Sequence, residues 1–272
     1  MINLAVNYSP QAAQLTAEGR IELDFFKCPD WPGMIAEAQK LKPVAVHFTL
    51  KAGGSSLAGV DWNPIEAMLT ATGTPHVNLH LAPETRDFPY IPVDETDPQI
   101  IQPVLDRMLQ DVSAAVNRFG AERVIIENVP YRGAGGNFLR PGVEPRLFSQ
   151  IVRETGCGFL LDISHARIAA HSLKMDEQNY MQTLPVERLK ELHITGVHTI
   201  NGRLQDHLPI LPQDWLVFDW VCEKIQQGEW PSPWLVAYEY GGVGELFEWR
   251  SDAAVIAEQM PLLFEKIKRI DC

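Results

Sequence analysis

Residues 160–166 read LLDISHA, and they show the pattern on which the fold prediction depends. An apolar run ends at Asp162, and His165 follows three residues later, where the chain is expected to turn. Such a run is typical of a buried strand in a parallel sheet. The carboxylate and the imidazole at its end have three readings: a metal site, a catalytic acid and base, or a polar strand end.

The same kind of run recurs along the chain, and longer amphipathic segments separate the runs. Short runs rich in Val, Ile and Leu predict eight strands, at residues 2–6, 21–26, 44–50, 76–81, 123–129, 158–163, 191–196 and 234–240. Candidate helices lie at 11–18, 31–41, 63–72, 98–119, 144–156, 177–189, 213–227 and 252–268. Some begin with a capping residue and a proline, as at Asp97-Pro98.

This alternation predicts an α/β protein, a single (β/α)8 TIM barrel that spans residues 1–272 as one domain. Such barrels typically need about 250 residues. A doubly wound open sheet is the alternative, but that fold normally has a glycine-rich turn after its first strand. Residues 7–14, NYSPQAAQ, contain no glycine, so the barrel is favoured.

The composition excludes several classes of protein. With 35 Asp and Glu against 23 Lys and Arg, the formal net charge of −12 argues against a nucleic-acid partner. The sequence predicts neither a membrane span nor a signal peptide. The four cysteines lack Cys-x-x-Cys spacing, so neither a disulfide framework nor a zinc ribbon is indicated. We expect a cytoplasmic protein that does not bind membranes.

Potential metal ligands gather where a TIM barrel places its chemistry, at the C-terminal ends of the strands and in the loops after them. They are His47, His80, Glu127, Asp162, His165, His193, Asp206, His207 and Glu239. Each alone is better explained as a buried residue with a hydrogen-bond partner. Together they would form a cluster of buried charge, which cations would neutralise.

The mixture of imidazoles and carboxylates suits iron, zinc or manganese, whereas magnesium and calcium prefer oxygen ligands. The ligands exceed the needs of one ion, so two or three divalent transition-metal ions are predicted, with Glu127 or Glu239 as a bridging carboxylate. Glu127, Glu239 and His165 are also the candidate catalytic residues.

Polar residues near the same strand ends are candidates for substrate binding: Asn128, Arg132 and Arg203. The guanidinium group of an arginine can hold a carboxylate or a phosphate. Three other histidines are not assigned to the site. His76 precedes a strand, and His171 and His198 are expected in solvated loops.

The order of these ligands resembles the series found in the xylose isomerase-like barrel superfamily, especially in trinuclear members such as endonuclease IV. A narrower resemblance rests on IENVPY (126–131), TGCGFLLDI (155–163), LPVERLKELHITGVH (184–198) and GRLQDHLPI (202–210). These segments resemble an originally uncharacterised barrel family whose characterised members are multinuclear iron oxidases. Those members modify cysteines of ribosomally made peptides, as in methanobactin biosynthesis. The chain differs at Ser164-His165, where many members carry Asn, and in the direct adjacency of Asp206 and His207.

The resemblance implies a di- or trinuclear site, with iron the favoured metal, and oxidative modification of a small or peptide substrate. It also implies a separate partner protein that presents the peptide. Three alternatives stay open: a sugar isomerase or epimerase with one divalent ion, an endonuclease IV-like phosphodiesterase, and a non-catalytic metal-binding scaffold. The isomerase would need only one ion and therefore fewer ligands. The phosphodiesterase would need a phosphodiester substrate, and the scaffold would have no open coordination position.

Overall fold

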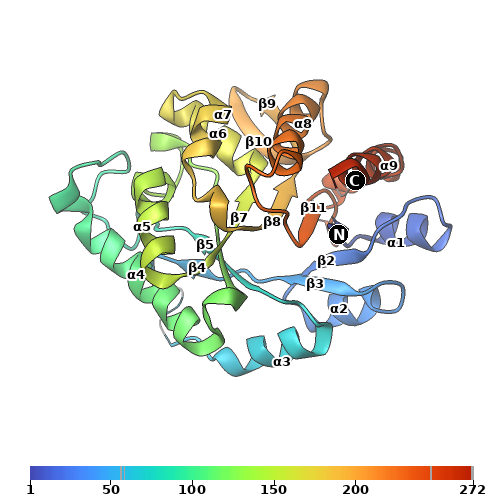
Figure 1. The fold of residues 1–272 in the computed structure, drawn as a ribbon, viewed down its shortest axis with the longest axis horizontal. Helices are drawn as coiled ribbons and strands as arrows, with labels where there is room; N and C mark the ends of the chain where they lie inside the picture. Colours follow the sequence, from blue (N-terminus) through green and yellow to red (C-terminus); the bar gives the residue numbers. More distant parts are fainter. Residues whose placement is uncertain (56, 58, 246, 271–272) are drawn as a thin grey trace. The chain divides into compact units, whose positions relative to one another are not determined.

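A computed structural model describes residues 1–55, 57, 59–245 and 247–270, so Cys272 lies outside the described residues. Strands and helices alternate along the chain (Figure 1). The contacts divide the chain into two compact units. The first unit comprises residues 1–47, 68–74 and 190–272, and the second comprises 48–67 and 75–189. The prediction of a single domain stays a prediction.

The first unit contains a parallel sheet whose strands alternate with helices. The strand order is β3 (Val44–His47), β2 (Phe25–Pro29), β1 (Asn3–Asn7), β11 (Leu235–Tyr238) and β8 (Leu189–Ile194). The helices are α1 (Pro10–Ala17), α2 (Pro32–Ala38), α8 (Pro212–Gln226), α9 (Ala253–Ile270) and the 3-10 turn η5 (Glu248–Arg250). An antiparallel hairpin, β9 (Gly196–Ile200) and β10 (Arg203–Leu208), follows β8.

The second unit repeats the parallel pattern with strands in sequence order. These are β4 (Lys51–Ala52), β5 (Val77–Leu81), β6 (Val124–Glu127) and β7 (Gly158–Asp162). Its helices are α4 (Pro98–Phe119), α5 (Pro145–Thr155), α6 (Ile163–Leu173) and α7 (Glu177–Thr183), and α4 and α5 pack together (Figure 1). Short 3-10 turns are η1 (Ala121–Arg123), η2 (Gly133–Gly135), η3 (Arg140–Val143) and η4 (Val186–Arg188). Helix α3 (Trp62–Thr72) begins in the second unit and ends in the first.

Local chemistry explains where the helices begin and end. Ser9 caps α1, because its Oγ accepts a hydrogen bond from the Ala12 N–H at 3.1 Å. Asp97 caps α4 in the same way through Gln99 N–H at 2.9 Å. Helix α5 ends at Gly156, whose φ of 72° is a left-handed conformation that favours glycine. Each cap also directs the chain between a strand and its helix.

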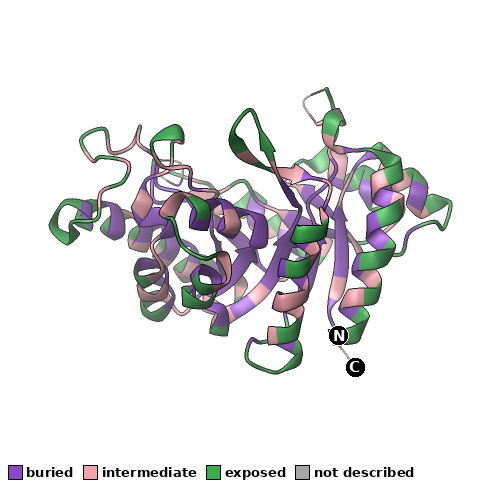
Figure 2. Ribbon diagram, turned by 90° about the horizontal axis from the view of Figure 1, so that it is seen from above, coloured by how far each residue is buried: buried purple, intermediate pink, exposed green. Residues whose placement is uncertain are grey.

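Burial separates the strands from the outer faces of the helices (Figure 2). Every residue of β6, β7 and β11 is buried, as expected for parallel strands that are covered on both faces. The helices expose one side and bury the other, which fits their amphipathic patterns. Hence the candidate site residues at the strand ends are supported by a packed interior.

The structure confirms the predicted strand and helix types and corrects several positions. The strand predicted at 21–26 lies at Phe25–Pro29, and residues 21–24 form an irregular lead-in with buried Ile21 and Leu23. The helix predicted at 177–189 is wrong in extent, because α7 ends at Thr183 before Pro185 and β8 begins at Leu189.

Helix α6 and the β9–β10 hairpin lie where the sequence predicted loops. Helix α6 directly follows β7, so His171 lies in its last turn and not in a loop. His198 lies in β9, the first strand of the hairpin. The sequence of this short segment did not indicate a strand. Among the described residues, no helix is both long enough and apolar enough to cross a bilayer.

Candidate functional site

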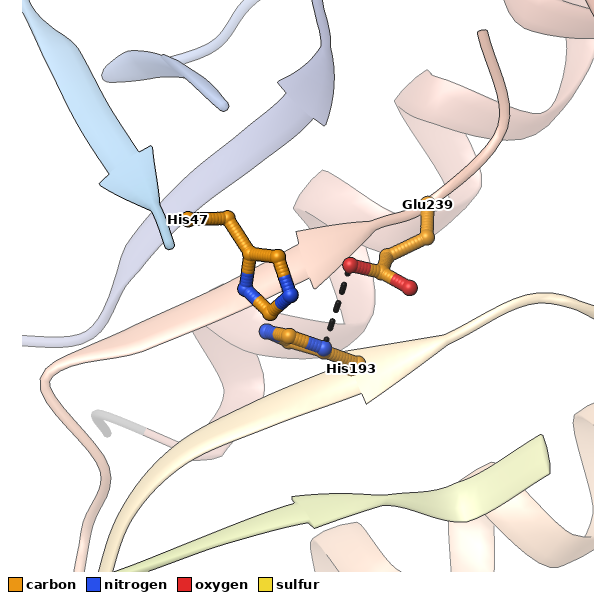
Figure 3. A group of neighbouring side chains, drawn as sticks. All are labelled: His47, His193 and Glu239. Atoms are coloured by element: carbon orange, nitrogen blue, oxygen red, sulfur yellow. Dashed lines mark ion pairs between the residues drawn. The ribbon is translucent and has the colours of Figure 1, made fainter. Parts of the chain in front are cut away.

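Three predicted ligands of the first unit point toward one another at the C-terminal ends of its strands (Figure 3). His47 is the last residue of β3, His193 lies in β8, and Glu239 directly follows β11. Each offers a ligand atom within 4.8 Å of the others. Nδ1 of His193 lies 3.2 Å from Oε1 of Glu239, and the ring centroids of His47 and His193 are 5.3 Å apart. Two imidazoles and a carboxylate therefore converge at one place.

Strand register explains this convergence. β11 pairs with β8 so that Ala237 lies opposite His193. Because side chains alternate along a strand, Glu239 is expected on the same face as Ala237, and Glu191 on the same face as His193. This face includes small residues, since Ala237 belongs to a buried cluster with Ala5 and Ala45. Small side chains leave room for the longer ligands.

Neighbouring groups keep both carboxylates near His193 ionised. Burial alone would raise the pKa of Glu239, but the imidazoles of His193 and His47 lower it well below its usual range. Burial would also raise the pKa of Glu191. The Lys27 ammonium and His193 outweigh that effect and lower the pKa of Glu191 from 4.5 to about 2. An ionised carboxylate can bind a metal ion or accept a hydrogen bond from an imidazole.

The other two predicted ligands of the first unit lie in β10. Adjacent residues of a regular strand point to opposite faces, yet Asp206 and His207 offer ligand atoms within 4.8 Å of each other. A register shift between Gln205 and Leu208 and the left-handed φ of His207, 57°, account for this arrangement. Oγ1 of Thr195 accepts a hydrogen bond from the His207 N–H at 3.1 Å and supports the distorted strand.

The second unit brings together the remaining predicted ligands. His80 and Glu127 are cross-strand partners, and Nε2 of His80 lies 3.3 Å from Oε2 of Glu127. Nδ1 of His165 lies 3.6 Å from Oε1 of Glu127 and 3.5 Å from Oδ2 of Asp162. Asp162 is also the N-cap of α6, because its Oδ1 accepts a hydrogen bond from the His165 N–H at 2.7 Å. The three-residue spacing of this pair is thus the geometry of a helix cap.

Four candidate ligand histidines, two in each unit, have one ring nitrogen close to a neighbouring oxygen. In His80, Nδ1 lies 3.1 Å from the Leu50 carbonyl oxygen. In His165, Nδ1 lies 2.9 Å from the Asn128 carbonyl oxygen, and in His207 it lies 3.0 Å from the Glu239 carbonyl oxygen. In His193 the fixed nitrogen is Nε2, 2.9 Å from Oε1 of Glu191. An imidazole that donates one N–H in this way presents a lone pair on its other nitrogen, as metal-binding histidines do. The donor set therefore fits transition-metal ions.

The predicted substrate-binding residues have different surroundings. Asn128 is fully buried, and its side chain exchanges two hydrogen bonds with the backbone of Asp162, at 2.8 and 2.9 Å. Its amide therefore fixes the end of β7. Arg132 is half-buried and donates to the Pro130 carbonyl at 3.1 Å, whereas Arg203 is exposed at the start of β10. Their role in substrate binding stays a prediction, as does the catalytic role of Glu127, Glu239 and His165.

Sequence reasoning missed three charged residues of the first unit: Lys27, Glu191 and Arg250. Lys27 is 2% exposed within the strand FFKCP, and it contacts Glu191 and His193. A lysine inside an apolar strand was the available signal. The guanidinium carbon of Arg250 lies 4.5 Å from the centroid of the Phe247 ring. Burial lowers the pKa of Arg250, and the negative charges of Glu239 and Asp206 oppose that effect. The position of Arg250 beyond the last strand gave no signal.

Relatives of the chain are found among proteins designated UPF0276. The chain is 27% identical to the protein of Acaryochloris marina over 217 residues, which cover 77% of this chain and 71% of that protein. It is 24% identical to the protein of Chromobacterium violaceum over 178 residues, 64% of this chain and 60% of that one.

Solved structures share the fold at low sequence identity. D-psicose 3-epimerase matches with a TM-score of 0.59 and 10% identity over 99% of both chains. Endonuclease IV from Thermus thermophilus matches with a TM-score of 0.56 and 14% identity, over 97% of this chain and 99% of that one. Both are xylose isomerase-like TIM barrels, and the likeness confirms that fold for this chain. The family profile of the RiPP precursor modification enzymes MbnB/TglH/ChrH matches residues 94–252, more than half of the chain, and the chain belongs to this family.

Proposed function

We propose that this chain is a multinuclear, iron-dependent enzyme that oxidatively modifies a peptide. The observation that carries the proposal is the ring orientation of four candidate ligands, His80, His165, His193 and His207: one nitrogen of each lies close to an oxygen that can accept its proton, and carboxylates lie near the rings. The family description supports a peptide as substrate, because it names enzymes that modify ribosomally made peptide precursors.

The two units together contain enough candidate ligands for two or three metal ions. In the first unit these are His47, His193 and Glu239, with Asp206 and His207 in the hairpin. In the second unit they are His80, Glu127, Asp162 and His165. Iron, when bound, would supply redox chemistry and affinity for a substrate thiolate.

The protein side chains have separate tasks in this proposal. Glu127 and Glu239 are buried carboxylates that would balance the charge of bound ions. His165 lies against Glu127 and Asp162 and would offer Nε2 to an ion, since its Nδ1 faces the Asn128 carbonyl. The peptide would be presented by a separate partner protein. A small thiol is the alternative substrate.

The decisive experiment is elemental analysis of protein purified without oxygen, followed by O2 consumption in the presence of cysteine-containing peptides. We expect iron at two or three equivalents per chain and O2 uptake that depends on the peptide thiol. Mass spectrometry of the peptide should show loss of hydrogen or gain of oxygen. A serine version of the peptide is the substrate control.

Matched variants test the ligand assignment. His165→Ala and Glu127→Ala should each reduce the iron content, whereas His171→Ala should not, because His171 is exposed at the end of the same helix as His165. Full metal content in both ligand variants would refute the assignment. Stoichiometric zinc without iron would point to hydrolysis, and a single manganese or magnesium ion to isomerisation, so either result would overturn the oxidase proposal. Bound metal without turnover would favour a scaffold.

A further inference from the structure

We propose that Glu191 is a positioning residue that selects Nδ1 of His193 as its metal-binding atom, with Lys27 as the built-in counter-charge. This inference rests on the proposed metal-dependent function. It concerns residues that bind no metal themselves in that proposal, and it explains why a buried lysine lies beside a candidate ligand.

The geometry defines two alternative hydrogen-bond states of His193. Oε1 of Glu191 lies 2.9 Å from Nε2 of His193 and accepts a hydrogen bond if Nε2 carries the proton. Nδ1 then presents a lone pair toward the position that His47 and Glu239 surround. Lys27 Nζ also contacts Nε2. If Nε2 accepted from Lys27 instead, Nδ1 would carry the proton and could not bind a metal ion.

The surroundings favour the first state. Glu191, Lys27 and His193 are each nearly inaccessible to water, at 6%, 2% and 0% exposure. Lys27 donates to Oε1 of Glu191 at 2.5 Å, so the ammonium keeps a charged acceptor when Nε2 of His193 carries the proton. An ionised carboxylate is also a stronger acceptor for the imidazole N–H than a neutral group. Lys27 therefore holds Glu191 in place and compensates its charge, and Glu191 orients the ring.

Two neutral double variants separate the hydrogen bond from the charge. Lys27→Met with Glu191→Gln removes both charges but keeps an oxygen that can accept from Nε2. Lys27→Met with Glu191→Leu removes the charges and the acceptor. Lys266→Met with Asp219→Asn is the matched control, since this pair joins α9 to α8 in the same unit at 2.5 Å. Thermal unfolding of the metal-free variants verifies that each is folded.

The first measurement is affinity for Co2+ by competition with a chelator. We expect the Gln variant and the control to bind Co2+ nearly as tightly as the wild type, and the Leu variant to bind about 10- to 100-fold more weakly. Equal affinities of the Gln and Leu variants would overturn the proposed role of Glu191.

The second measurement does not depend on metal binding. Nitrogen-15 NMR of metal-free wild-type protein, with the His193 signal assigned by its loss in His193→Gln, reports which ring nitrogen is protonated. A proton on Nε2 supports the inference, and a proton on Nδ1 refutes it. If the wild type has the expected tautomer but binds neither Co2+ nor iron, the metal-dependent function fails while the orienting role of Glu191 stands.

Discussion

Asp162 has two roles in the structure, and two substitutions should separate them. It caps α6 through the His165 N–H at 2.7 Å, and it is a proposed metal ligand in the second unit. Asp162→Ala removes the cap, which typically costs about 1 kcal/mol. The His165 N–H that loses its acceptor is buried, which places the cost at the upper end of the range for N-caps, about 2 kcal/mol. We therefore expect a loss of about 2 kcal/mol in the free energy of unfolding of the metal-free protein.

Asp162→Asn should behave differently, because asparagine is as good an N-cap as aspartate. We expect the metal-free protein to lose less than about 0.5 kcal/mol, while the bound iron falls as strongly as in the alanine variant. Asp176→Ala, which removes the exposed cap of α7, is the control and should leave the iron content unchanged. Urea unfolding of metal-free protein and elemental analysis of iron-loaded protein are the assays. The reasoning is refuted if Asn destabilises as much as Ala, or if the Asn variant keeps all its iron.

Three further predictions follow from burial, close packing and linkage. Burial raises the pKa of the Cys28 thiol from 9.0 to about 12, so the thiol ionises more easily in the unfolded chain than in the folded protein. The free energy of unfolding should therefore be unaffected by this group below pH 9 and should fall by about 1.4 kcal/mol per pH unit between pH 9 and pH 12. Cys28→Ala should unfold with a shallower dependence on alkaline pH in urea, and an identical slope would contradict this. Gly196→Ala should give little folded protein, because the new Cβ would lie 1.8 Å from the Pro209 carbonyl oxygen, whereas Gly33→Ala has open space and should fold normally by circular dichroism. Removing the metal with a chelator should lower stability by about 3 to 4 kcal/mol relative to protein in metal at 100 to 1,000 times its Kd; unchanged thermal unfolding would argue against a structural contribution of the metal.

Much of the fold could be predicted because the local signals agreed. Apolar runs and capping residues marked the strands and helices, and the proline at the first position of α4 marked its start. The predictions failed where local pattern and tertiary context differ. The helix at Ile163–Leu173 begins at a residue that still belongs to an apolar run, so period alone did not show where β7 ended. The hairpin of β9 and β10 has exposed and half-buried residues without strict alternation.

The candidate site shows the same division between local and tertiary information. Ligand types and their places at strand ends were visible in the sequence, because a parallel barrel sends its strand ends to one face. The second task of Asp162 as a helix cap was not visible, since it depends on the start of α6. The relation of Asp206 to His207 also depended on structure, because a bulge and a positive φ reorient adjacent side chains.

By itself, the sequence determined the α/β alternation, the family resemblance and the chemical types of the ligands. Those properties are carried by residue identity and by periods of two and about 3.6 residues, which neighbouring positions express. Only the tertiary structure decided which ring nitrogen of His80, His165, His193 and His207 lies close to an oxygen. It also decided that Lys27 lies against Glu191, 164 positions away in the chain. The physical reason is that hydrogen bonds and buried charges act through space over a few ångströms, and strand register sets those distances.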